Sequence, residues 1–147
     1  MRARAVARGA GVGLLAAAAL STVSVAQIQN GSFAGTIECE ALPRLRPLRT
    51  KVTMVVADGR ARYEREILHP TGGPSGIFER GEGPVTPGGE VTLTTRVDTP
   101  GYGYEAEYKG RIEESVARLT GRQRWKLRNE SGTIPRSCSL ELMRVAQ

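Results

Sequence analysis

Lys51 to Leu68 reads KVTMVVADGRARYEREIL, and this stretch decides the fold because it holds one complete β-hairpin. Apolar and polar residues alternate on both sides of Asp58-Gly59, with the period of two that is typical of half-buried strands. Asp-Gly favours a two-residue hairpin turn, since both central positions need a positive φ. The residues predicted to face inward are Val52, Met54, Val56, Ala61, Tyr63 and Ile67, and those predicted to face outward in the second arm are Arg60, Arg62, Glu64 and Glu66.

Strand-like segments recur on both sides of this hairpin. They cover residues 33–39 before it, and residues 77–83, 91–97, 102–108, 117–127 and 137–143 after it. Turn signals rich in Gly and Pro separate the segments at intervals of roughly 8–15 residues, and no helical periodicity of useful length is present. We therefore predict an all-β domain of about eight short antiparallel strands. The spacing fits an up-and-down barrel, which we favour, or a β-sandwich.

The chain's two cysteines lie near opposite ends of this series, in GTIECEALPRLRPL (35–48) and RSCSLELM (136–143). By alternation, Cys39 and Cys138 both fall on inward faces. Two cysteines in an exported domain form a disulfide by default. We predict a Cys39–Cys138 bond, which would lock the first and last strands of a barrel together or cross between the sheets of a sandwich. It would close a loop of about 100 residues, a stabilisation of up to about 4–5 kcal/mol.

The N-terminal segment 1–26 has the features of a secretory signal peptide. Three arginines without an acid precede an apolar core at residues 9–20, and Ser24-Val25-Ala26 supplies small residues for cleavage. The core is shorter than the ~20 residues of a membrane span, and no cysteine follows it to accept a lipid. We predict cleavage after Ala26, a single domain over residues 27–147 with no membrane span, and a bacterial periplasmic or secreted location.

Charge gives little support to a nucleic-acid partner. The complete chain has 21 Lys and Arg against 15 Asp and Glu, and three of the basic residues belong to the predicted signal peptide. The mature domain is therefore only mildly basic, which is ordinary for an exported domain. Its most basic strand also lacks aromatic residues on the same face, where single-stranded nucleic acid would stack. We expect no nucleic-acid partner.

Three stretches resemble a group of small exported bacterial proteins. They are NGSFAGTIECEALP (30–43), YEAEYKGRI with LTGRQRW (104–112 and 119–125), and CSLELMR (138–144). Proteins of that group pair a G-[ST]-[WF]-x-G-x-[IV]-x-C opening with a C-terminal cysteine strand. The resemblance implies a fold and transfers no catalytic residues. GSFAGTI and the strand count also resemble avidin and lipocalin barrels, although Phe33 stands where those families usually place a tryptophan.

No pattern in the sequence points to catalysis. His69, the only histidine, precedes Pro70 in a Pro/Gly-rich loop that is typical of a solvated side chain. Metal ligation would rest on carboxylates, because the cysteines are predicted to be oxidised. Glu105 and Glu107 have a spacing that a glycosidase could use, but the same spacing recurs at Glu38/Glu40 and Glu64/Glu66. We expect no enzyme activity, no cofactor and no metal.

One strand carries a row of basic residues on its outward face. Acids on adjacent strands, Glu105, Glu107 and Glu141, would compensate these charges in a solvated salt-bridge ladder. Alternatively the row binds an anionic envelope component, because the planar fork of arginine suits carboxylates and phosphates. The candidate residues are Arg118, Arg122, Arg124, Lys126 and Arg128.

Aromatic residues on the inward faces form a second candidate site. They fill the core or, in a barrel open at one end, line a pocket for a small amphipathic ligand. The residues concerned are Tyr63, Tyr102, Tyr104, Tyr108 and Trp125. Two non-enzymatic functions follow: a small-ligand carrier in the cell envelope, or an envelope or protein-interaction module that uses the basic strand.

Overall fold

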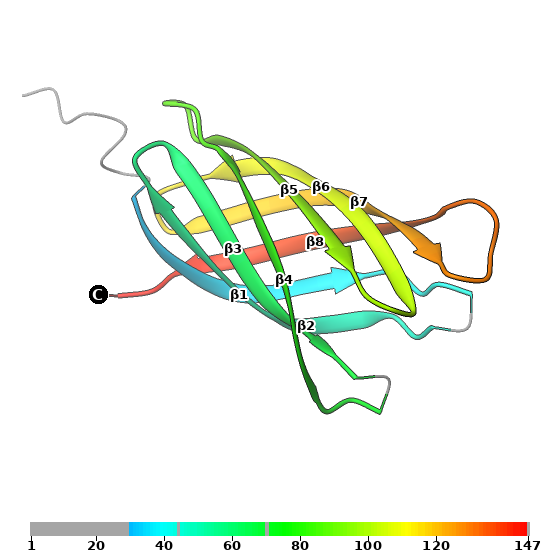
Figure 1. Ribbon diagram of the computed structural model, residues 1–147. Helices are drawn as coiled ribbons and strands as arrows, with labels where there is room; N and C mark the ends of the chain where they lie inside the picture. The colour runs from blue at the N-terminus through cyan, green and yellow to red at the C-terminus, as the bar shows by residue number, and fades with distance from the viewer. Residues whose placement is uncertain (1–29, 44, 70, 147) are drawn as a thin grey trace, which may run out of the picture.

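The protein is a closed up-and-down barrel of eight antiparallel strands (Figure 1). The computed structural model describes residues 30–43, 45–69 and 71–146. The strands are β1 (Gly31–Cys39), β2 (Leu48–Ala57), β3 (Arg60–Leu68), β4 (Pro74–Pro84), β5 (Glu90–Asp98), β6 (Tyr102–Ile112), β7 (Val116–Leu127) and β8 (Ile134–Arg144). The predicted barrel is confirmed over the sandwich. The predicted signal peptide lies outside the described residues, among which no helix is long and apolar enough to cross a membrane.

The hairpin that decides the fold forms as predicted. Asp58 and Gly59 connect β2 to β3 with φ values of 50° and 72°. Met54 pairs with Tyr63 and Val56 with Ala61 across the two strands. All of the predicted inward residues of this hairpin are buried, and its outward residues are exposed or half-buried.

The barrel closes where its first and last strands meet. β8 pairs antiparallel with β1, and Cys39 lies directly opposite Cys138 in that register. The two residues form a disulfide, with their Cα atoms 4.0 Å apart. The predicted disulfide between Cys39 and Cys138 is therefore confirmed. The first and last strands are also neighbours, as the barrel prediction required.

The interior of the barrel has an apolar half and a polar half. The apolar half lies toward the β2–β3, β4–β5 and β6–β7 turns and is packed with Phe33, Met54, Val56, Leu93, Ile112 and Leu142, among others. The polar half lies toward the opposite end and contains the buried residues Tyr63, Arg65, Glu79, Tyr104, Tyr108, Gln123, Trp125 and Arg136. Burial of apolar surface explains why the apolar half is inside the barrel, but it does not explain why charged residues are buried among aromatic rings in the polar half.

Candidate functional site

A single carboxylate organises the polar half of the interior. Glu79 of β4 has no exposed surface. Its Oε1 accepts hydrogen bonds from the hydroxyls of Tyr63 at 2.5 Å and Tyr108 at 3.2 Å, and its Oε2 accepts one from Tyr104 at 2.6 Å. Oε2 also forms an ion pair with Nη2 of Arg65. Four donors from β3 and β6 therefore converge on one side chain.

The hydrogen bonds extend from Glu79 across β6 and β7. The Tyr108 hydroxyl accepts a bond from Nε2 of Gln123 at 2.9 Å, and Oε1 of Gln123 accepts one from Nε1 of Trp125 at 2.8 Å. The Tyr104 hydroxyl accepts a bond from Nη2 of Arg65 at 3.0 Å. This continuous network supplies the hydrogen bonds that buried polar groups require, except at Nε of Arg65, which has no partner among the described residues.

Burial shifts the pKa of the groups in this network. The pKa values of Tyr63, Tyr104 and Tyr108 are raised well above their ordinary value, first by burial and next by the charge of Glu79. Burial opposes the charge of Arg65, but the Glu79 carboxylate and the three buried tyrosines together outweigh it, and the pKa of the guanidinium is raised. Arg65 therefore stays charged, and the three phenols stay neutral hydrogen-bond donors.

The predicted aromatic residues come together at this end of the barrel. The ring of Trp125 stacks on Tyr104 at 4.5 Å and on the half-buried Tyr102 at 5.1 Å, between ring centroids. Tyr63 and Tyr108 meet edge to face at 5.8 Å. Of the five, Tyr63, Tyr104, Tyr108 and Trp125 are buried. They fill the interior, and whether this end opens to a ligand stays a prediction.

Sequence reasoning missed the charged members of the network. Arg65 lies between Tyr63 and Ile67 on the inward face of β3, so the alternation already placed it inside. Gln123 likewise lies between inward positions of β7. Glu79 carried a weaker signal, because the next inward positions of β4 are Gly81 and Gly83 and because Ile77, on the same face, is exposed.

The five predicted basic residues are all exposed on the outer face of β7 and just beyond it. Two of them have carboxylate partners on neighbouring strands or turns. Arg118 lies 3.5 Å from Glu141 and 3.9 Å from Glu113, and Arg124 lies 3.4 Å from Glu105. The salt-bridge ladder is therefore present in part.

The other three, Arg122, Lys126 and Arg128, have no carboxylate within 4.0 Å among the described residues. The register explains two of these cases. Arg122 lies opposite Glu107, but Glu107 pairs with Lys109 at 2.7 Å. Lys126 lies opposite Gly103, which has no side chain to offer.

Lys126 and Arg128 border an open hollow that we call the basic groove. It has a volume of about 590 Å³ and lies where β5 and β7 end and β6 begins. Its charged lining is Arg96, Asp98, Glu105, Arg124, Lys126 and Arg128. Four cations thus face two carboxylates. Arg96 belongs to this set although sequence reasoning did not select it, because it lies on β5, with β6 between it and the basic row on β7.

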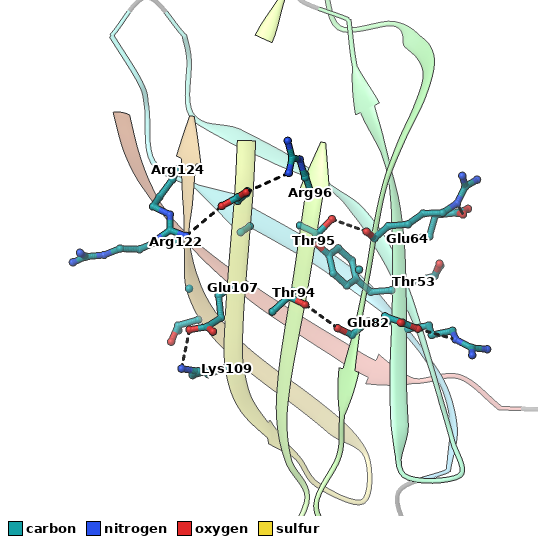
Figure 2. A pocket seen from close by; sticks show the side chains of 18 of the residues that line it. Thr53, Glu64, Glu82, Thr94, Thr95, Arg96, Glu107, Lys109, Arg122 and Arg124 are labelled. Carbon is teal, nitrogen blue, oxygen red and sulfur yellow. Dashed lines mark hydrogen bonds and ion pairs between the residues drawn. The ribbon is translucent and has the colours of Figure 1, made fainter. Parts of the chain in front are cut away.

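A larger hollow, which we call the charged depression, continues from the groove along the outside of the sheet. It has a volume of about 1460 Å³ and shares Arg96, Glu105 and Arg124 with the groove. Figure 2 shows Arg122 and Arg124 at one side of this depression and Arg96 between them and Glu64, with dashed lines marking the ion pairs of Arg96 and Arg124. Glu105 lies 3.8 Å from Arg96 and 3.4 Å from Arg124. One carboxylate is therefore shared by two arginines, and one of their two positive charges is uncompensated.

The residues that the sequence offered for catalysis, His69, Glu105 and Glu107, are all exposed. The described residues contain no group of three or more His, Cys, Asp or Glu side chains placed to hold a metal ion. His69 is exposed, and its Nδ1 lies 2.9 Å from Oγ1 of Thr71. The paired acids of β6, Glu105 and Glu107, point outward and form ion pairs with basic neighbours.

Comparisons with family models, with curated proteins and with solved structures find no significant match to this chain. Function is therefore inferred from the chain's own residues.

Proposed function

We propose that this protein is an exported, non-enzymatic interaction module that binds an anionic partner through the basic groove and the adjoining Arg122. The observation that carries the proposal is the set of three exposed cations without carboxylate partners, Arg122, Lys126 and Arg128, beside a hollow surface. Basic side chains on one strand repel one another, and an anionic ligand would relieve this repulsion. Carboxylate and phosphate groups both match the fork of arginine.

Placement of the cations favours an extended partner over a single small ion. Arg122, Arg124 and Lys126 follow one another at every second position of β7, so their backbones are spaced by about 7 Å along the strand. Arg96 extends the positive surface across to β5. A polymer with carboxylate or phosphate groups along its length would reach several of these side chains at once, which increases its affinity.

A second candidate is the small-ligand carrier, with a pocket at the aromatic end of the barrel. The half-buried Tyr102, stacked on Trp125, is the observation that favours it. The hydroxyls of Tyr63, Tyr104 and Tyr108 are already engaged with Glu79, so a ligand deep in the barrel would have to break these bonds. We therefore place the carrier second.

Export is part of the proposal. The Cys39–Cys138 disulfide suits an oxidising compartment such as the periplasm, where such bonds persist. We expect the protein recovered from the periplasm or medium to begin at Gln27, two hydrogens lighter than its reduced form. Intact mass spectrometry measures both. A full-length cytoplasmic protein with free thiols would contradict the proposed location.

The binding test uses fluorescence anisotropy with labelled polygalacturonate and labelled polyphosphate, which carry the two candidate anions. Replacing Arg122, Lys126 and Arg128 together by Gln should weaken binding of the better probe by roughly tenfold or more at low salt. The matched control replaces Lys51, Arg60 and Arg111 by Gln, which removes the same charge from residues outside both hollows. Equal loss of binding in the two variants would show a general charge effect and would contradict binding at the groove. Failure of the unsubstituted protein to bind either polymer would also contradict the proposal.

A further inference from the structure

The polar half of the barrel contains more positive than negative charge. Two guanidinium groups are buried there, those of Arg65, 3 % exposed, and Arg136, 4 % exposed. Among the described residues, the one buried carboxylate is that of Glu79. Because moving a charge out of water is costly unless an opposite charge accompanies it, this interior is short of one negative charge.

Glu79 cannot supply the missing charge to Arg136. Its two oxygens already accept from three tyrosine hydroxyls and from Arg65. Arg136 donates only to backbone carbonyls, from Nε to Glu40 O at 2.7 Å and from Nη2 to Arg46 O at 3.3 Å. No carboxylate lies within 4.0 Å of Arg136 among the described residues. Burial lowers the pKa of this guanidinium, and the nearby charge of Arg65 lowers it further.

Arg65 provides a second, independent observation. Its Nε atom is buried and has no hydrogen-bond partner, although Nη2 of the same group is engaged with Glu79 and Tyr104. Buried N–H donors are almost always paired in native proteins. An unpartnered donor beside an excess of positive charge indicates the place of an acceptor that carries negative charge.

The two guanidiniums belong to the same end of the barrel. Arg65 contacts the hydroxyl of Tyr104, the Tyr104 ring stacks on Trp125, and the guanidinium carbon of Arg136 lies 6.0 Å from the centre of the Trp125 ring. One aromatic pair therefore links both cations. We propose that the polar half of the barrel is a binding site for one small monovalent anion, held by Arg65 Nε and neutralising the surplus charge of Arg136.

Tyr104, which accepts a hydrogen bond from Arg65, also lines the basic groove, so the test of this site removes the outer cations first. The starting protein is the full chain with Arg122, Lys126 and Arg128 replaced by Gln. Its urea unfolding midpoint is measured against concentration of acetate, chloride or phosphate at matched ionic strength. A ligand that binds only the folded state raises the midpoint by linkage. We expect acetate or chloride to raise it, and the stronger of the two to identify the anion as carboxylate or halide.

Arg136→Gln in this background should abolish the anion-dependent rise, because the surplus charge is gone, whereas Arg60→Gln, which removes an exposed cation, should leave it unchanged. If Arg136→Gln does not fold, Arg136→Lys preserves the charge and should retain the rise. The side-chain NMR signal of Arg65 Nε–H, assigned with Arg65→Lys, should shift as acetate or chloride is added. A midpoint independent of both monovalent anions, or an unshifted Arg65 signal under saturating anion, would overturn the proposal.

Discussion

At the residue scale, Glu79 governs the interior of this barrel. It is a fully buried carboxylate with four donors, and Arg65 depends on it for a counter-charge. The three tyrosines would lose a shared acceptor without it. For both reasons, we expect removal of the Glu79 charge to destabilise the core strongly.

Glu79→Gln should lower the free energy of unfolding by about 3–5 kcal/mol, because it leaves the Arg65 guanidinium buried without a counter-ion. Glu64→Gln is the matched control, since Glu64 forms an exposed ion pair with Arg80 at 2.5 Å. Exposed pairs contribute about 0–1 kcal/mol. Urea unfolding of the two variants measures the difference. Equal losses would mean that Glu79 does not carry a charge that Arg65 needs.

The buried tyrosines predict how stability depends on pH. In the folded state the pKa values of Tyr63, Tyr104 and Tyr108 are raised, mainly by burial and next by Glu79. Above about pH 10, where unfolded tyrosine ionises, the folded protein binds more protons than the unfolded chain. The free energy of unfolding should therefore be unaffected by these groups below about pH 9 and fall above about pH 10, by up to about 1.4 kcal/mol per pH unit for each tyrosine.

Ultraviolet phenolate absorbance, recorded beside circular dichroism during an alkaline titration, checks this expectation. Phenolate from these three tyrosines should appear only as the barrel unfolds, in the same transition. Ionisation of more than one tyrosine while the circular dichroism is still native would contradict the buried network.

Residue-level prediction from the sequence succeeded where alternation was clear. Tyr63, Tyr108 and Trp125 were placed inside by the period of two, and they are inside. Alternation could not predict which side chains meet across the barrel. Glu79 and Tyr104, for example, are 25 positions apart and meet only after β4 and β6 are both positioned. Likewise, the outward row of β7 was visible, but which of its cations lacks a partner depends on register.

At the element scale, glycines on inward faces allow neighbouring strands to come close. A Cβ added to Gly121 of β7 would lie 1.9 Å from the carbonyl oxygen of Glu107 on β6. Gly83 of β4 is tighter still, with Thr92 O at 1.6 Å from such an atom. Glycine at such positions lets strands come close and coil, as closure of a small barrel requires.

Gly121→Ala should therefore destabilise the barrel, by roughly 1–3 kcal/mol or more, since the new methyl group meets backbone and forces the strands apart. Gly101→Ala is the control, because nothing lies within 4 Å of a Cβ at that loop position. Thermal unfolding followed by circular dichroism compares the two. A melting temperature unchanged by Gly121→Ala would mean that the β6–β7 approach is looser than described.

The disulfide acts on the pairing between β1 and β8, the only strand pair in the ring that is not consecutive in the chain. Replacing both Cys39 and Cys138 by Ser should cost about 2–5 kcal/mol of unfolding free energy, because the unfolded chain gains freedom when its long loop is opened. Urea unfolding of the double variant, beside wild type with and without reductant, measures the loss. Coincident curves for reduced and oxidised wild type would contradict this role.

At the scale of the whole molecule, the order of the strands followed from the succession of turn signals, and the cysteines added the information on closure. Hairpins such as β2–β3 are encoded locally, by Asp58-Gly59 and by the alternation around it. Closure of the barrel depends on how strongly each strand coils, and a short sequence pattern does not predict this. The basic groove is similarly a property of the assembled sheet, because Arg96, Gly103 and Lys126 come from three strands.

The central claim is that the basic groove is where an anionic partner binds, and NMR mapping tests it most directly. Backbone amide signals of the isotope-labelled protein are followed while unlabelled oligogalacturonate, or oligophosphate if polyphosphate is the better binder, is added. We expect the largest shifts at Gly103, Arg122, Arg124, Lys126 and Arg128, saturating with added ligand, and small shifts at Lys51 and Arg60 on β2 and β3. Shifts centred on β2 and β3, or spread evenly over all exposed basic residues, would contradict the claim.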